Sequence, residues 1–183
     1  GALVSIVGYN GLMRMLTEKR LPFPNEILDG LREIVVDSFH GKGQNDLKDG
    51  MDLSLCRLDL DSKILYFSGA YNGCIVIRAG ELIELKADKQ PIGQFENAFP
   101  FTLQQFAVQA NDTIYLFTDG YVDQFGGEKG KKLKSTGFKA LLLQASELPI
   151  DEQHALFSSF FTRWKGNLEQ VDDVCILGVR ISE

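Results

Sequence analysis

The sequence predicts an α+β domain in which helices cover antiparallel sheets. Its elements follow in the order two helices, a run of six strands, two helices and one last strand. Because only short connections separate the six strands, we expect them to pair antiparallel. The chain has 183 residues, 44% of them apolar, which is enough to bury a sizeable core. Since we find no internal repeat and no linker, we expect residues 1–183 to form a single domain.

Two helices are predicted at the start of the chain. Apolar residues recur at helical spacing from Leu3 to Leu16 and again from Ile27 to Val35. Prolines separate these two segments, and Asn25 is expected to cap the second helix. A polar, glycine-rich loop from His40 to Lys48 then leads to the strands.

From Met51 onward the spacing of the apolar residues is that of strands and no longer that of helices. Two hairpins are predicted, with tight turns at Asp61-Ser62 and Ala79-Gly80. The six predicted strands are Met51 to Leu60, Lys63 to Ser68, Cys74 to Arg78, Glu81 to Leu85, Phe101 to Val108 and Thr113 to Thr118.

The last third of the chain returns to helices. A loop rich in glycine and lysine is expected from Gly120 to Lys134. Helices are predicted at about Gly137 to Ala145 and from Pro149 to Trp164, with the proline near the helix start where its ring is tolerated. A final strand from Val174 to Ile181 closes the domain.

Charge and composition exclude several classes of protein. With 19 basic and 25 acidic residues, the net charge is −6, which offers no basic surface for nucleic acid. The apolar runs are too short to span a bilayer, and we see no secretory signal, so we expect a cytoplasmic domain without membrane contact. Three cysteines cannot all pair with one another within the chain, and we expect them to be reduced and buried.

Two acidic segments lie at the ends of predicted buried strands. Asp119-Gly120 follows the strand that ends at Thr118, and Asp172-Asp173 precedes the strand that begins at Val174. Carboxylates at such positions are expected to be rigid and partly desolvated, and they are the ligands that Mg²⁺ and Mn²⁺ prefer. The same residues also fit an ordinary Asp-Gly turn and a solvated loop, and spacing alone leaves both interpretations open.

Two further charged segments have simpler interpretations. Asp59-Leu60-Asp61 leads directly into another strand and is predicted to be a hairpin tip. Four lysines, Lys129, Lys131, Lys132 and Lys134, lie in one loop. They fit either a solvated flap or a positive patch that attracts a phosphorylated protein.

At these residues the chain resembles a known family, the SpoIIE-like branch of the metal-dependent serine/threonine protein phosphatases (PPM, or protein phosphatase type 2C-like). The similar stretches occur in the family's order and cover nearly the whole chain. They are Gly1-Ala2-Leu3-Val4-Ser5, Asp49-Gly50-Met51-Asp52 leading to Leu55, Phe67-Ser68-Gly69-Ala70 with Asn72, Lys89 through Pro91-Ile92-Gly93, Phe117-Thr118-Asp119-Gly120 with Asp123, and Asp172-Asp173.

The resemblance implies a fold and a chemistry. The fold is an α-β-β-α sandwich of antiparallel sheets flanked by helices. In the family, two Mn²⁺ or Mg²⁺ ions activate a water that attacks the phosphorus of phosphoserine or phosphothreonine. By position, Asp119 and Asp172 match metal ligands of the family. Asp173 matches a neighbouring position and ranks below them as a candidate ligand.

The resemblance also implies partners. The two N-terminal helices match regulatory helices that sensor or partner domains move in the family. Family members commonly act on small proteins of the anti-sigma-antagonist type, so we expect a phosphorylated protein as substrate and an upstream sensor domain as regulator. Nothing in these residues selects one particular substrate.

The sequence also departs from the family pattern. An early Gly-Asp and an Asp-x-Thr-Gly-His-Gly motif have no counterpart here, so we expect an N-terminally truncated domain with weak metal binding and little activity. An uncovered face at that end could drive formation of a homodimer. Two further hypotheses therefore stand beside the phosphatase: a pseudophosphatase that acts as a regulatory interaction module, and a metal-independent interaction domain in which Asp119 and Asp172 are turn residues.

Overall fold

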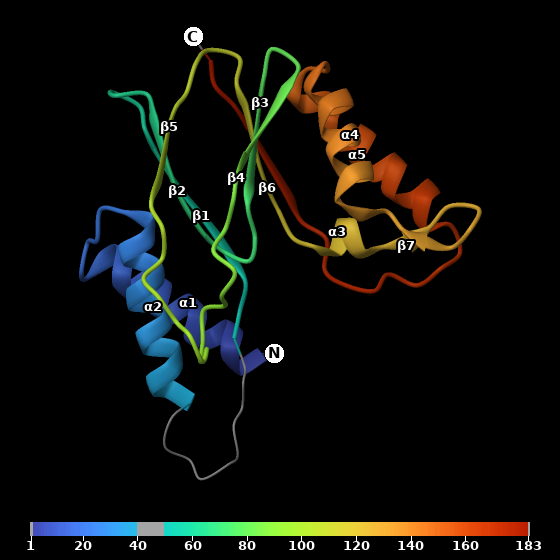
Figure 1. The fold of residues 1–183 in the computed structure, drawn as a ribbon. Coiled ribbons are helices and arrows are strands. Elements are labelled where there is room, and N and C mark those ends of the chain that lie inside the picture. Colours follow the sequence, from blue (N-terminus) through green and yellow to red (C-terminus); the bar gives the residue numbers. More distant parts are fainter. Residues whose placement is uncertain (1, 40–49, 183) are drawn as a thin grey trace. The chain divides into compact units, whose positions relative to one another are not determined.

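The computed structural model describes residues 2–39 and 50–182 (Figure 1). These residues form helices and antiparallel sheets, so the predicted α+β class is confirmed. The chain divides into two compact units. The first unit comprises residues 1–73 and 85–108, and the second comprises residues 74–84 and 109–183.

Two helices, α1 (Ala2–Thr17) and α2 (Pro24–Phe39), begin the first unit and pack against each other (Figure 1). Both predicted helices are confirmed. The prediction that Asn25 caps α2 is wrong, because the helix already begins at Pro24. A proline suits the first helical turn, since its fixed φ is helical and its missing N–H needs no partner there.

The sheet of the first unit has the strand order β1-β2-β5. Its strands are β1 (Leu53–Asp59), β2 (Ile64–Ala70) and β5 (Gln104–Ala107), and all neighbours are antiparallel. The predicted hairpin at Asp61-Ser62 is confirmed, and the Asp59 carboxylate accepts a hydrogen bond from the Ser62 amide at 3.0 Å. The core between α2 and this sheet consists of Leu28, Leu31, Val35, Ala70, Ile92 and Phe101.

Segments that resemble the phosphatase family converge in this unit. Met51 and Ile92 exchange two backbone hydrogen bonds of 2.9 and 3.1 Å. The Ser54 hydroxyl donates to the Asn72 carbonyl at 2.6 Å, which ties the start of β1 to the end of the Phe67-to-Asn72 stretch. Asp49, the first residue of the Asp-Gly-Met-Asp stretch, lies outside the described residues, as does the predicted loop from His40 to Lys48.

The sheet of the second unit has the strand order β4-β3-β6-β9. Its strands are β3 (Cys74–Arg78), β4 (Glu81–Leu85), β6 (Thr113–Phe117) and β9 (Ile176–Arg180). At the turn between β3 and β4, Ala79 and Gly80 both have positive φ, 49° and 79°, as a two-residue hairpin turn requires. The prediction that the strand before Asp119 is an interior strand is confirmed, because β6 lies between β3 and β9.

The last strand differs from its prediction. We expected a buried strand from Val174, but β9 begins at Ile176, and Leu177 and Val179 are 54% and 42% exposed. The physical reason is that, among the described residues of the second unit, a helix packs on only one face of β9, so the alternate side chains on its other face are exposed.

The segment from Gly120 to Lys134 also differs, because it is not simply a loop. It contains the short helix α3 (Gly120–Asp123) and a two-stranded ribbon of β7 (Phe125–Gly126) and β8 (Lys131–Lys132). The Trp164 carbonyl accepts a 2.8 Å hydrogen bond from the Gly127 amide, which holds the ribbon to the helix that follows it.

Two longer helices, α4 (Lys134–Ser146) and α5 (Ile150–Lys165), complete the second unit and lie side by side (Figure 1). Both were predicted, and Pro149 directly precedes α5. They bury an aromatic-rich core of Ile75, Ile77, Tyr115, Tyr121, Phe138, Leu141, Leu142, Ala145 and Phe157. No helix among the described residues combines the length and the apolar character needed to cross a membrane.

Candidate functional site

The two acidic segments singled out in the sequence meet at one end of the second unit. Strand β6 ends beside the segment that leads into β9, and Thr118 joins them. Its hydroxyl donates to the Asp173 carbonyl at 2.9 Å and accepts from the Cys175 amide at 3.0 Å. Its own amide donates to the Cys175 carbonyl at 3.1 Å. Asp119 and Asp172 are therefore brought to adjoining loops, although 52 residues separate them in the sequence.

Gly120 allows this close approach. A Cβ atom at this position would overlap the Asp173 carbonyl oxygen and would lie 3.3 Å from the Asp172 carbonyl carbon. Both contacts are with backbone, which cannot move aside as a flexible side chain can. The Asp-Gly pair is thus a packing requirement of the site and not only a turn.

The carboxylates are more exposed than we expected. Asp119, Asp172 and Asp173 are all exposed, so the prediction that they are partly desolvated is wrong. Asp119 precedes α3, and its carbonyl accepts the Asp123 amide at 2.9 Å. Asp172 accepts a hydrogen bond of 2.7 Å from the Asp173 amide. The exposure follows from the position of these side chains beyond the strand ends, Asp119 after β6 and Asp172 and Asp173 before β9.

The chemistry of these side chains fits part of a divalent metal site. Carboxylate oxygens are the ligands that Mg²⁺ and Mn²⁺ prefer, and the hydrogen bonds of Thr118 hold their backbone in place. Within residues 2–39 and 50–182, however, no three His, Cys, Asp or Glu side chains gather closely enough to hold a metal ion. Asp119 and Asp172 could therefore supply a share of a coordination sphere, and their role as ligands stays a prediction.

A basic ribbon is attached to the same acidic turn. Lys132 in β8 forms a 2.7 Å ion pair with Asp123, at the end of α3. The side chains of Lys129, Lys131 and Lys134 are exposed. The sequence pointed to the lysine cluster but not to the Lys132–Asp123 pair, because a Gly/Lys-rich segment does not show which lysine faces a carboxylate.

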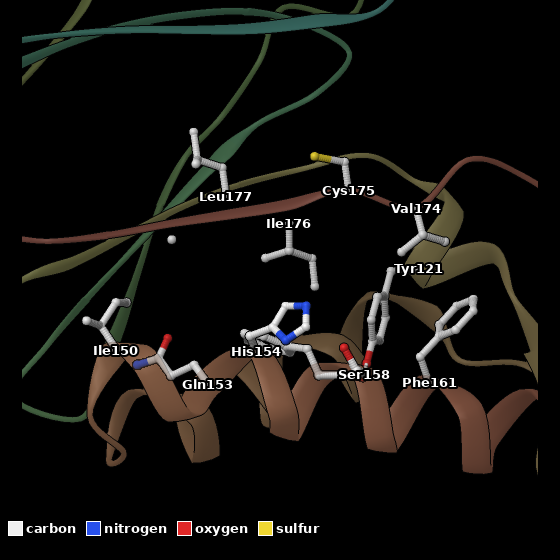
Figure 2. Close-up of a pocket in the computed structure, with 12 residues that line it drawn as sticks. Tyr121, Ile150, Gln153, His154, Ser158, Phe161, Val174, Cys175, Ile176 and Leu177 are labelled. Carbon is white, nitrogen blue, oxygen red and sulfur yellow. Dashed lines mark hydrogen bonds between the residues drawn. The ribbon is translucent and has the colours of Figure 1, made fainter.

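A groove of about 540 Å³ lies between α5 and β9, beside the acidic segments (Figure 2). Figure 2 shows His154 and Ile176 pointing into it, from the helix and the strand, while Cys175 and Leu177 point away from the helix. Among the described residues that line the groove there is no Lys, Arg, Asp or Glu, so its surface suits apolar groups rather than a phosphate.

The cysteines are free thiols, as predicted, but their burial differs among them. Cys74 is buried, Cys56 is half-buried and Cys175 is exposed. The prediction of burial is wrong for Cys175, which directly precedes β9 and points away from α5 (Figure 2).

Solved structures of known proteins match this fold. The PP2C domain of SiaA from Pseudomonas aeruginosa is 26% identical, with a TM-score of 0.87, and the match covers 99% of this chain and 69% of that one. A PP2C phosphatase domain of SpoIIE from Bacillus subtilis, solved with a fragment of its regulatory domain, is 18% identical with a TM-score of 0.72, and the match covers 98% of this chain and 50% of that one. The RsbU and RsbW domains of Rv1364c from Mycobacterium tuberculosis are 16% identical with a TM-score of 0.75, and the match covers 99% of this chain and 48% of that one. No curated protein matches the chain significantly.

The helices and antiparallel sheets are therefore those of the PPM phosphatase fold, the class that contains the PP2C domains. The family model of stage II sporulation protein E (SpoIIE) matches residues 1–182. The chain belongs to the SpoIIE family, and the resemblance inferred from its motifs is confirmed. It spans about two thirds of the SiaA domain and about half of the other two structures.

Proposed function

We propose that this chain is part of a metal-dependent protein phosphatase that hydrolyses phosphoserine or phosphothreonine on a signalling protein. The observation that carries the proposal is the meeting of the Asp119-Gly120 and Asp172-Asp173 segments, joined by the hydrogen bonds of Thr118 and the close approach of Gly120. Membership of the SpoIIE family and the PPM fold support it. An upstream sensor domain would regulate the enzyme, as the resemblance of α1 and α2 to regulatory helices implies.

Each part of the site has a role in this proposal. Asp119 and Asp172 would bind Mn²⁺ or Mg²⁺, with Asp173 as a further candidate ligand. When bound, such ions lower the pKa of a water and neutralise phosphate oxygens, so that the water can attack phosphorus. Thr118 positions both acidic segments, and the exposed lysines of the ribbon attract the phosphorylated substrate.

The test compares the full-length protein that the gene encodes with residues 1–183. We expect the full-length protein to hydrolyse a phosphoserine protein in Mn²⁺, and Asp119→Asn or Asp172→Asn to lower turnover by about 100-fold or more. Asp151→Asn, an exposed carboxylate at the start of α5, is the matched control and should change little. Because few ligands gather among the described residues, we expect residues 1–183 alone to bind Mn²⁺ weakly and to turn over slowly.

A second candidate is a regulatory interaction module without catalysis, a pseudophosphatase. The observation that favours it is the lack of a third metal-ligating side chain near Asp119 and Asp172 in the described part of the chain. Calorimetric titration of the full-length protein with Mn²⁺ distinguishes the two. Saturable binding that Asp119→Asn abolishes supports the phosphatase, whereas no binding and no turnover would support the module.

A further inference from the structure

Gln124 is a fully buried glutamine that directly follows α3, with 0% of its surface exposed. Its side-chain nitrogen (Nε2) donates to the Glu169 carbonyl at 2.9 Å and to the Phe125 carbonyl at 3.0 Å. Its side-chain oxygen (Oε1) accepts from the Val171 amide at 3.3 Å. Two of these three partners belong to the segment that leads directly into Asp172.

The backbone of Gln124 is itself held by two other segments of the second unit. Its carbonyl accepts a 3.0 Å hydrogen bond from the Trp164 indole of α5 and a 3.2 Å hydrogen bond from the Leu133 amide, just after β8. The side chain therefore extends from a fixed base, and its contacts with Glu169 and Val171 fix the position of that segment.

The chemistry of an amide suits this position. The segment before Asp172 presents one carbonyl and one N–H to the buried side chain, so its partner must both donate and accept. A carboxylate only accepts, and lysine and arginine only donate, whereas the amide of Gln124 does both and adds no charge beside the acidic segments. Since a buried backbone group without a partner would be costly, these contacts favour a single position of the segment.

Gln124 and Thr118 hold the candidate ligands from both sides. The Thr118 hydroxyl donates to the carbonyl of the residue after Asp172, and Gln124 accepts from Val171, the residue before it. The same two side chains flank Asp119, one directly before it and the other just past α3. Asp119 and Asp172 thus lie between fixed points of the backbone, although both are exposed.

We propose that Gln124 is a positioning residue for the metal site. It fixes the place of Asp172 relative to Asp119, and it thereby sets how tightly their carboxylates bind Mn²⁺ or Mg²⁺; this inference rests on the proposed phosphatase function. Mg²⁺ requires ligands in a near-octahedral arrangement, so one loosened ligand weakens the whole set. Residues that orient metal ligands without contacting the metal commonly change its affinity by tenfold or more when they are replaced.

Calorimetric titration of the full-length protein with Mn²⁺ tests the proposal through Gln124→Met, which keeps the length of the side chain and removes its hydrogen bonds. Gln153→Met is the matched control. Gln153 is 2% exposed, lies toward the other end of α5, and bonds the Tyr115 hydroxyl at 2.8 Å and the Leu148 carbonyl at 3.2 Å. We expect both variants to lower the thermal midpoint, but only Gln124→Met to raise the dissociation constant for Mn²⁺, by at least tenfold. Equal dissociation constants in the two variants would overturn the proposal and make Gln124 a stabilising residue only.

Amide hydrogen exchange in the unchanged full-length protein tests the same contact without a variant, and so remains decisive if Gln124→Met does not fold. Saturating Mg²⁺ should slow exchange at the Val171 amide, because a contact that strengthens metal binding must in turn be strengthened by the metal. The Asn111 amide, which bonds the Ile181 carbonyl at the opposite end of β6 from Asp119, should change less. Equal effects at the two amides would contradict the proposal. A protein that binds neither ion would contradict the proposed function itself, and this proposal with it.

Discussion

The hydroxyl of Thr118 donates a 2.9 Å hydrogen bond to the backbone carbonyl of Asp173, a residue 55 positions later in the chain. Together with the bond from the Cys175 amide, it joins the two acidic segments through one side chain, beside the backbone bond from the Thr118 amide to the Cys175 carbonyl. The site therefore depends on a hydroxyl that is not itself a candidate ligand. Changes at Thr118 should affect the geometry of Asp119 and Asp172 without removing a carboxylate.

Replacing Thr118 with valine removes the hydroxyl while keeping the branched shape. We expect the free energy of unfolding of residues 1–183 to fall by about 1 to 2 kcal/mol, because the Cys175 amide and the Asp173 carbonyl both lose a partner. Thr118→Ser keeps the hydroxyl and should cost less. Urea denaturation followed by fluorescence of Trp164, the only tryptophan, measures both variants. A loss of stability for serine with none for valine would show that the methyl group, and not the hydroxyl, stabilises this junction.

Gly120→Ala should be more harmful than an ordinary glycine-to-alanine change. The new Cβ would overlap the backbone of Asp173, so the acidic segments must move apart. We expect this to lower the free energy of unfolding by about 1 to 3 kcal/mol. Gly137→Ala in α4 is the contrast, because its new Cβ meets only the flexible side chain of Leu133 and alanine favours the helix. Thermal unfolding of both variants gives the comparison. A Gly120→Ala chain as stable as the original would mean that the two loops separate at little cost.

Asp112 should make the second unit sensitive to acid. Its side chain is fully buried, and burial alone would raise its pKa. Two hydrogen bonds from Arg78, at 2.7 and 2.9 Å, and one from the Gln109 amide outweigh that effect and hold the pKa below its usual range. A depressed carboxyl pKa adds stability above the unfolded-state value of about 4, and this stability is lost as the pH falls through the folded-state pKa.

We therefore expect the urea midpoint reported by Trp164 to fall between pH 5 and pH 3, and Asp112→Asn to flatten that fall. At pH 7 the free energy of unfolding of the same variant should be lower by about 3 kcal/mol, because Arg78 is left without its buried partner. Asp151→Asn, at an exposed position, controls for the removal of one carboxylate. If Asp112→Asn kept the full acid dependence, the sensitivity would have to come from other carboxylates.

Arg32 should hold the segment from Gln90 to Phe101 against α2. Its guanidinium donates to the Gln90 side chain at 3.1 Å, to the Phe99 carbonyl at 2.8 Å and to the Asp29 carboxylate at 2.9 Å. The ammonium group of lysine lacks the planar, forked set of donors of a guanidinium. We therefore expect Arg32→Lys to lower the free energy of unfolding by about 2 kcal/mol. It should also speed hydrogen exchange at the Phe99 amide, which donates to Gln90.

Arg14→Lys is the matched control for this prediction. Its side chain is 58% exposed and its ion pair with Glu18 is an exposed one of 3.3 Å, so the substitution should lower the free energy of unfolding by less than about 0.5 kcal/mol. Exchange at Phe99 that Arg32→Lys leaves unchanged would contradict the role given to the guanidinium.

Local patterns were sufficient to predict most elements, because helical and strand periods reflect burial along a single segment. The helix from Leu3 to Leu16 and the turn at Ala79-Gly80 are examples, and both are confirmed. The division of the strands between two sheets could not be predicted in this way. β5 pairs with β2 and β6 pairs with β3 and β9, and such pairings depend on contacts distant in sequence.

The candidate site was predictable for a different reason. Asp119 and Asp172 were singled out by their place at strand ends and by the family resemblance, and the structure brings their segments together. The role of the Thr118 hydroxyl in joining the two segments was not foreseen. Threonine is common in strands because of its β propensity, so its presence at a strand end does not indicate such a role. The exposure of Leu177 was not foreseen either, since an apolar run does not show whether both faces of its strand are covered.

The lysine ribbon supplies the last prediction, which rests on the proposed phosphatase activity. Lys129 and Lys131 are exposed, whereas Lys132 is paired with Asp123, so the first two lysines are free to meet a phosphoprotein without loosening the ribbon. In the full-length protein, Lys129→Glu with Lys131→Glu should raise KM for a phosphoprotein about three- to tenfold at low salt. The value of kcat should not change, because the ribbon attracts the substrate and does not take part in the reaction.

Salt and substrate size separate this effect from damage to the fold. The rise in KM should shrink at 0.5 M salt, where charges are screened within about 4 Å, and it should be absent for a small phosphate ester that cannot reach the ribbon. Lys19→Glu, an exposed lysine after α1, changes the charge elsewhere and should have no effect on KM. A fall in kcat at unchanged KM would instead place the ribbon in the reaction itself, because only a group that acts in the transition state lowers kcat without weakening the binding of the substrate.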